Sequence, residues 1–279
     1  MIQINDLSFN YSRNKVFEHL TLSLEKGNVY GLLGQNGVGK TTLLKIMAGL
    51  LKSEHTACVV NGFHPYKRQP SFLADIYYLP EEPACPPGTV GELGHNYGTF
   101  YPGFKIEQFY SLLERFEVKP EKKFKDLSAG QQKKAHISYA LSLNTGILLL
   151  DEPSNGLDIP SKALFRSIVS GYINDDRIMV ISTHQVRDLE NLIDPVIILD
   201  NKEVLLHATI QEISEKVCFI TKSDSDPEAL YTEETPLGYA MVKSNTQKLD
   251  TKVNLEALFN AVLSHKEWFN EHFKEYDHE

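Results

Sequence analysis

Cysteine, long apolar runs and surplus positive charge are all scarce in this 279-residue chain. Its three cysteines, Cys58, Cys85 and Cys218, show neither metal-ligand spacing nor the density of a disulfide framework, which is typical of proteins in a reducing compartment. No run of about 18 apolar residues occurs, so the sequence predicts no membrane-spanning helix. The net charge of −9 argues against a general nucleic-acid-binding protein, which needs clustered lysine and arginine, and we expect no nucleic-acid partner.

The apolar segments that are present alternate between strand-like and helix-like patterns. A buried strand at 29–33 precedes a helix that starts near Gly39. An amphipathic helix is predicted at 105–118, a second helix begins near Gly130, and strand-like runs follow at 146–153 and 177–184. Strands separated by helices predict an α/β fold with a largely parallel sheet.

The pattern loosens near the C-terminus, where the chain becomes polar and acidic. We expect a main domain at 1–215, with a helical subdomain at about 81–140, and a small C-terminal extension at 216–279. The extension ends in an amphipathic helical segment, whose apolar face is explained by core packing or by docking of a partner. The residues on that face are Leu255, Leu258, Phe259 and Val262.

Residues 34–42, GQNGVGKTT, match the phosphate-binding pattern G-x-x-x-x-G-K-[ST] between a predicted strand and a predicted helix. Glycines let backbone N–H groups surround a phosphate, and the helix N-terminus adds a positive field. Lys40 is expected to bind the outer phosphates and Thr41 to ligate Mg²⁺. The predicted nucleotide-binding residues here are Gly34, Gln35, Asn36, Gly37, Val38, Gly39, Lys40, Thr41 and Thr42.

A second apolar strand, 147–150, is followed directly by two carboxylates. Asp151 falls at the carboxyl end of the strand, where ligands gather in open α/β sheets, and is expected to bind Mg²⁺ directly or through water. Glu152 is the candidate general base that polarises an attacking water. Without the phosphate loop, a helix cap or a solvated turn would explain these acids equally well.

Five motifs in a fixed order resemble those of ABC-type ATPases over about residues 1–210. They are the phosphate loop, LSAGQQ (127–132), LLLDEP (148–153), SNGLD (154–158) and ISTH (181–184). The resemblance implies a P-loop NTPase core of ABC type, with a mixed sheet, N-terminal antiparallel strands and a helical subdomain. In this family the LSAGQQ-type signature turn of one domain caps the γ-phosphate bound to a second domain, so a chain with one of each is half of a two-site dimer.

The resemblance also implies roles for residues outside the phosphate loop. His184 falls where the family has a histidine that contacts the γ-phosphate, with a local strand-end pairing as the alternative. Asp158 falls where the two sites are joined across the dimer, and Tyr11 where an aromatic ring stacks on adenine or, alternatively, packs in the sheet. Ala129 departs from a position where glycine is more usual. The expected nucleotide-contacting residues of the signature turn are Ser128, Gly130 and Gln131.

Glu81 is a second departure from the family pattern. After the strand DIYYLP the family usually has a glutamine that helps hold Mg²⁺ and couples to the membrane partner, whereas this chain has Glu81 followed by Glu82. A carboxylate can also ligate Mg²⁺, so Glu81 is a candidate metal ligand, with a solvated loop acid as the alternative. The Pro-Glu-Glu sequence resembles ATP-binding subunits of bacterial drug and antibiotic exporters.

The resemblance implies an ATPase subunit that uses ATP and Mg²⁺ to power a membrane transporter, with an exporter favoured over an importer. The expected partners are a separate transmembrane permease subunit and a second ATP-binding subunit, identical or different. The expected location is cytoplasmic, on the inner face of the cell membrane. A soluble ABC-type ATPase in assembly, translation or repair is the alternative. It is disfavoured by the single ATPase half and the absence of sustained heptads. A sensing module, with the extension as its ligand binder, ranks last. The sequence leaves the cargo open.

Overall fold

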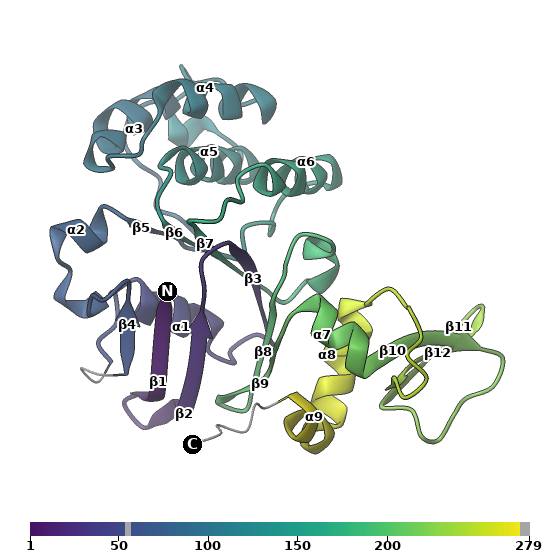
Figure 1. Ribbon diagram of the computed structural model, residues 1–279. Helices are drawn as coiled ribbons and strands as arrows, with labels where there is room; N and C mark the ends of the chain where they lie inside the picture. The colour runs from purple at the N-terminus through teal and green to yellow at the C-terminus, as the bar shows by residue number, and fades with distance from the viewer. Residues whose placement is uncertain (54–56, 274–279) are drawn as a thin grey trace.

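The computed structural model describes residues 1–53 and 57–273, which form three β-sheets with helices packed around them (Figure 1). The central sheet has six strands in the order β5-β6-β7-β3-β8-β9. These strands are β3 (Asn28–Leu33), β5 (Ile76–Leu79), β6 (Ile147–Asp151), β7 (Ile178–Thr183), β8 (Val196–Asp200) and β9 (Glu203–Ala208). The first five in the sheet order are parallel and β9 pairs antiparallel with β8, so the sheet is mixed, as expected.

A smaller antiparallel sheet covers one face of the central sheet. Its strands are β1 (Ile2–Tyr11), β2 (Asn14–Leu24) and β4 (Cys58–Val60). Helix α1 (Lys40–Met47) lies between the two sheets, because its Leu43 and Leu44 share one buried cluster with Ile4, Ile147 and Leu149. The phosphate loop at the start of α1 is therefore attached to an element that is packed on both sides.

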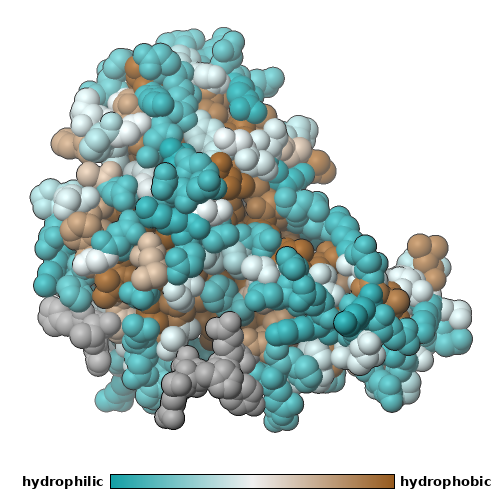
Figure 2. All heavy atoms as spheres, viewed as in Figure 1, coloured by the Kyte–Doolittle hydropathy of each residue, from teal (hydrophilic) through white to brown (hydrophobic). Residues whose placement is uncertain are grey.

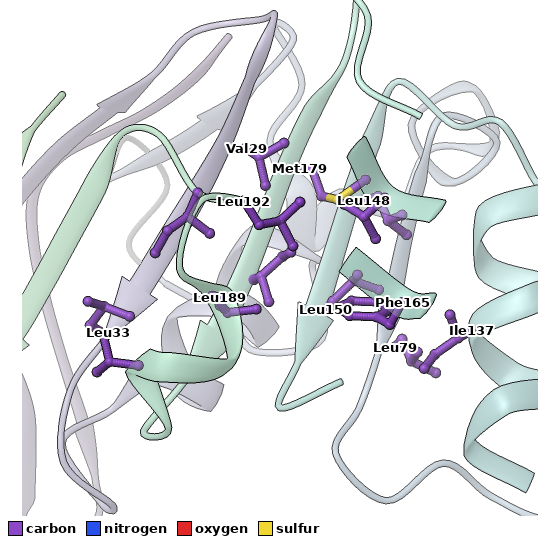
Figure 3. Close-up of a cluster of buried hydrophobic side chains, with 14 of the residues drawn as sticks. Val29, Leu33, Leu79, Ile137, Leu148, Leu150, Phe165, Met179, Leu189 and Leu192 are labelled. Carbon is purple, nitrogen blue, oxygen red and sulfur yellow. The ribbon is translucent and has the colours of Figure 1, made fainter. Parts of the chain in front are cut away.

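Helices cover the other face of the central sheet. They are α5 (Ala129–Ser142) and α6 (Ile159–Ser170), while α3 (Val90–Tyr97) and α4 (Ile106–Arg115) pack on the far side of α5 (Figure 1). The helices predicted at 105–118 and near Gly130 are thus confirmed. Side chains of strand β6 pack on both faces of the central sheet. Leu148 and Leu150 belong to the hydrophobic cluster on the helical side, and Ile147 and Leu149 to the cluster beside α1. Figure 3 shows Leu150 beside Phe165 of α6, and Leu148 next to Met179 of β7. Such strict alternation of two buried faces is what a strand covered on both sides requires.

Short elements complete this part of the chain. They are α2 (Pro70–Leu73) and the 3₁₀ turns η1 (Pro65–Lys67), η2 (Gly98–Phe100), η3 (Phe124–Asp126) and η4 (Val186–Leu189). Residues 80–103 are rich in proline and glycine, which predicts loops with short helical pieces, and α3 and η2 are such pieces. The segment DPVIILDNKEVL, 194–205, whose pattern predicts one strand, contains β8 and most of β9, which form a tight antiparallel pair.

The C-terminal extension contains a third sheet, of which the sequence pattern indicates only one strand, YAMVKS at 239–244. It follows α7 (Ile210–Lys216) and has the order β10-β12-β11, with β10 (Val217–Lys222), β11 (Tyr231–Thr235) and β12 (Gly238–Ser244). The predicted C-terminal helix is two helices, α8 (Leu255–Ser264) and α9 (Lys266–Phe273), and residues 274–279 of the predicted extension lie outside the described residues.

Core packing explains the apolar face of α8. Leu255, Leu258 and Val262 are buried and belong to the same hydrophobic cluster as one face of the central sheet, while Phe259 packs against it half-buried. The boundary at residue 216 stays a prediction, because this cluster runs across it. The face of the molecule shown in Figure 2 is mostly hydrophilic. Among the described residues no helix combines the length and the hydropathy needed to cross a membrane.

Candidate nucleotide-binding site

The glycine-rich loop between β3 and α1 has a backbone that other residues would not adopt. Gly37 and Gly39 have φ angles of +82° and +112°, in the left-handed region that favours glycine. A Cβ on Gly39 would lie 2.8 Å from the side chains of Val16 and Phe17. No side chain caps the N-terminus of α1, so its first N–H groups remain available for another acceptor. A close-approach loop that leads into an uncapped helix suits a phosphate group.

Lys40 is buried between this loop and the acidic strand end. Its Nζ donates hydrogen bonds to the carbonyl oxygens of Gly34 (2.8 Å) and Gln35 (3.2 Å), and it lies 3.6 Å from Oε1 of Glu152. Burial lowers the pKa of Lys40, whereas the carboxylates of Glu152 and Asp151 raise it. The ammonium group is therefore held at the junction of the phosphate loop and the candidate catalytic carboxylates.

Asp151 is fixed by donors from both neighbouring strands. Its Oδ1 accepts from the Ser182 hydroxyl at 2.5 Å, and its Oδ2 accepts from the Tyr78 hydroxyl at 3.0 Å. Burial and the nearby Asp151 raise the pKa of Tyr78 above its ordinary value, so the phenol stays a donor. Sequence reasoning missed Tyr78 and Ser182. The register of the parallel strands, which pairs Asp151 with Ser182, is the signal that could have found the serine.

Glu152 and His184 lie side by side beyond the ends of β6 and β7. The Glu152 backbone has φ +46°, and its N–H donates to the carbonyl oxygen and the hydroxyl of Ser182 at 3.2 and 3.1 Å. Oε1 of Glu152 lies 2.8 Å from Nδ1 of His184. A buried carboxylate held in this way can accept a proton from a water molecule, which is the chemistry of a general base.

The donor set near Asp151 fits Mg²⁺ better than a transition metal. Within the described residues no group of three or more His, Cys, Asp or Glu side chains could form a complete protein cage for a metal. Mg²⁺ commonly uses one or two carboxylates together with hydroxyl, water and phosphate oxygens. Thr41 at the start of α1 and Asp151 at the end of β6 could supply the protein ligands.

The signature turn forms the exposed N-terminus of α5. The Ser128 hydroxyl accepts from the backbone N–H of Gln131, and the Gln131 side chain accepts from the N–H of Ser128, a reciprocal capping box. A Cβ on Gly130 would lie 3.3 Å from the carbonyl oxygen of Gly156, so the turn packs against the loop that follows Glu152. Asp158 caps α6 by accepting from the N–H of Ser161, a local role that sequence reasoning did not consider.

The side chains of Glu81 and Tyr11 make their hydrogen bonds and ring contacts with residues other than Lys40, Asp151 and Glu152. Oε1 of Glu81 accepts from Nδ2 of Asn155 at 2.7 Å, and its backbone carbonyl oxygen accepts from Nζ of Lys133 at 2.5 Å. Tyr11 ends β1 with 46% of its surface exposed, and its ring meets Phe9 edge to face at 5.1 Å. The metal role of Glu81 and the adenine contact of Tyr11 stay predictions.

Comparisons with known proteins identify relatives of the whole chain. The family model described as "ABC transporter" matches residues 17–155. An ABC transporter ATP-binding protein of Methanocaldococcus jannaschii is 30% identical over 271 residues, covering 92% of this chain and 97% of the relative. A zinc-uptake ATP-binding protein of Bacillus subtilis is 30% identical over 220 residues, covering 73% of this chain and 92% of the relative.

A solved structure described as the ATP-binding subunit of an ABC transporter superposes with a TM-score of 0.70. It is 25% identical, and the likeness covers 76% of this chain and 91% of that one. The fold prediction, a P-loop NTPase core of ABC type, is thus confirmed. The chain belongs to the family of ABC transporter ATP-binding proteins, a family of ATPases.

Proposed function

We propose that the chain hydrolyses Mg·ATP as the motor subunit of a membrane transporter, and that two copies close around two ATP molecules. The observation that carries this proposal is the convergence of Lys40, Glu152 and His184, with Oε1 of Glu152 lying 3.6 Å from Lys40 Nζ and 2.8 Å from His184 Nδ1. A phosphate-binding ammonium and a candidate general base must be neighbours for hydrolysis at a γ-phosphate.

The residues divide the chemistry as follows. The loop N–H groups of residues 34–42 and the Lys40 ammonium bind the phosphates of ATP. Glu152 accepts a proton from the water whose oxygen attacks the γ-phosphorus, while the bond from that phosphorus to ADP breaks. His184 holds the Glu152 carboxylate in position. Thr41 and Asp151, with Glu81 as a further candidate, would hold Mg²⁺, which would supply positive charge to the phosphate oxygens.

Dimer closure is proposed because the chain has one phosphate loop and one signature turn. Ser128 is exposed at the N-terminus of α5, a 14-residue helix whose positive end suits an anion brought by another molecule. In a two-fold dimer, Ser128, Gly130 and Gln131 would cap the γ-phosphate on the partner, with Asp158 at the junction. Tyr11 would stack on adenine from its own chain.

The permease partner and the location are proposed from the family. A transporter motor of this kind lies on the cytoplasmic side of the membrane and moves a separate transmembrane subunit. The segment Pro80–Glu82 favours export, by its resemblance to exporter subunits, whereas the zinc-uptake relative belongs to an importing system. Transport assays with the purified complex in vesicles of known orientation would decide the direction.

The test of the proposed function is a pull-down from native membranes in mild detergent. The tagged Glu152→Gln chain with ATP is the bait, since slow hydrolysis would hold the closed state. Stoichiometric recovery of a polytopic membrane protein is the expected result. Recovery of soluble proteins or of the chain alone would leave the ATPase chemistry intact and overturn the transport role.

A further inference from the structure

Two ammonium groups are buried beside the candidate site, and the chemistry above uses one of them. In residues 1–53 and 57–273, Lys40 and Lys133 are the only buried lysines or arginines, each with 6% of its surface exposed. Lys133 lies on α5, the helix that carries the signature turn at its N-terminus. Because burying an unpaired ammonium group is costly, the groups around Lys133 indicate its role.

Lys133 faces the acidic side of the site. Its Nζ donates to the backbone carbonyl oxygen of Glu81 at 2.5 Å. Burial lowers the pKa of Lys133, and the carboxylates of Glu81, Asp151 and Glu152 oppose that effect. Of these carboxylates, Glu152 also lies 3.6 Å from the Lys40 ammonium group of the phosphate loop.

Glu81 is held from two sides. Lys133 binds its backbone carbonyl oxygen, and Nδ2 of Asn155, in the turn after Glu152, donates to its Oε1 at 2.7 Å. Oε1 of Glu81 is thus bound to the turn that follows Glu152, and Oε1 of Glu152 in turn lies 3.6 Å from Lys40 Nζ. The Asn155 hydrogen bond keeps the exposed Glu81 carboxylate beside the turn that follows Glu152, and the Lys133 hydrogen bond fixes the backbone at the same residue.

A fixed carboxylate next to a phosphate loop opposes the binding of ATP. The phosphates carry several negative charges, and a carboxylate held at this position repels them even though Glu81 is exposed to water. An ammonium group held near the same carboxylate reduces the repulsion. We propose that Lys133 is a positioning residue whose ammonium group offsets the Glu81 carboxylate, so that the phosphates of ATP can bind beside it. The proposal rests on the ATP site described under the proposed function.

A double-mutant cycle on the full chain tests the proposal. The variants are Lys133→Met, Glu81→Gln and their combination, with Lys133→Arg as the variant that keeps the charge. Binding of a fluorescent ATP analogue is measured in EDTA at fixed ionic strength, which separates charge compensation from any role of Glu81 as a metal ligand. Lys125→Gln removes an exposed lysine close to the signature turn and serves as the matched control.

We expect Lys133→Met to weaken binding about ten-fold when Glu81 is present, and by less than about two-fold when residue 81 is glutamine. Lys133→Arg and Lys125→Gln should stay within about three-fold of the parent chain. If Lys133→Met weakens ATP binding equally with glutamate and with glutamine at position 81, the lysine has only a structural role, holding α5 against the loop after β5. That result would overturn the proposal. No weakening in either background would also overturn it.

Two further results keep the test decisive. If Lys133→Met does not fold, Glu81→Gln alone carries the test, because its amide oxygen can still accept from Asn155. Tighter binding in EDTA, by about three-fold, is then expected, and unchanged or weaker binding contradicts the proposal. Failure of the parent chain to bind ATP at all would instead contradict the proposed function, before any variant is compared.

Discussion

The Nδ1 atom of His184 lies 2.8 Å from Oε1 of Glu152, although the two residues are 32 positions apart in the sequence. Strands β6 and β7 are parallel neighbours, and each residue follows the end of its strand at the same edge of the sheet. The same carboxylate oxygen lies 3.6 Å from Lys40 Nζ. Three motifs that are distant in the sequence thus meet at one oxygen atom, and the first prediction concerns this atom.

Replacing His184 with alanine should slow ATP turnover about 100-fold while leaving ATP affinity within about three-fold. The reason is that Glu152 loses the group that holds its Oε1, whereas Lys40 and the loop that bind phosphate are unchanged. Steady-state hydrolysis and equilibrium binding of an ATP analogue are the measurements. His19→Asn, in the exposed β1–β2 hairpin, is the control, and a His184→Ala enzyme with parental turnover would refute the role given to this histidine.

Tyr78→Phe should raise the Mg²⁺ concentration needed for half-maximal ATPase activity by about ten-fold. The change removes only the hydroxyl that donates to Oδ2 of Asp151, and the ring remains in place. Binding of ATP in EDTA should not change, because that measurement does not involve the metal.

Tyr77 provides a matched control for this prediction. It neighbours Tyr78 on β5, but its ring packs edge to face against Tyr101 and Tyr139, away from Asp151. Tyr77→Phe should leave the Mg²⁺ dependence unaltered. The same shift in both variants would show that β5 responds as a whole and that the Tyr78 hydroxyl has no specific effect on Asp151.

Alanine substitutions at Gly37 and Gly39 of the phosphate loop should lower the free energy of unfolding by different amounts. Gly37→Ala should lower the free energy of unfolding by about 1–2 kcal/mol, since φ is +82° but nothing lies within 4 Å of the new Cβ. Gly39→Ala should cost about 1–3 kcal/mol more, because its Cβ would meet the buried Phe17 ring at 2.8 Å. Urea unfolding of both variants checks this order, and equal costs would contradict the close packing inferred around Gly39.

His136 should make the protein sensitive to acid. Burial lowers the pKa of His136 from 6.5 to about 4, and its Nε2 has no hydrogen-bond partner among the described residues. Above pH 6.5 the imidazole is neutral in both states and has no effect. As the pH falls from 6.5 toward 4, the unfolded chain binds a proton that the folded chain does not, so stability is lost.

The expected contribution is about 2 kcal/mol of lost stability between pH 7.5 and pH 5. His136→Leu, which still packs against Phe124, should lose less stability than the parent chain over this interval by about that amount. Urea unfolding at the two pH values gives the difference, and His19→Asn, at an exposed position, should follow the parent. Identical pH dependence of His136→Leu and the parent chain would show that His136 does not carry the effect.

The central sheet and the phosphate loop could be predicted because their signals are local. Residues 29–33 form a short apolar run, and the pattern at 34–42 follows it directly, so β3, the loop and α1 follow from sequence alone. The carboxylates at the end of β6 were found in the same way. In contrast, Tyr78 lies on β5 and donates a hydrogen bond to Asp151 on β6, which is 73 positions later in the sequence. Only the order of strands in the sheet shows that these two residues meet.

The extension shows where local signals fail. Strand β11 has the polar and largely exposed sequence YTEET, which lacks the alternation of apolar and polar residues that predicts a strand. It is a strand because its backbone pairs with that of β12. The helical run near the end reads as one amphipathic segment, but His265 has a non-helical backbone and divides it into α8 and α9. Lys133 was overlooked for a related reason, since an isolated lysine on a helix gives no sign that it is buried.

The most direct test of the account is Glu152→Gln, examined with ATP by sedimentation and by single-turnover hydrolysis. The account predicts that the variant binds Mg·ATP, hydrolyses it at least about 100-fold more slowly than the parent, and forms a dimer only when ATP is present. Glu117→Gln, at an exposed position after α4, should behave as the parent chain. A Glu152→Gln protein that hydrolyses ATP at the parental rate and stays monomeric would contradict the central claim.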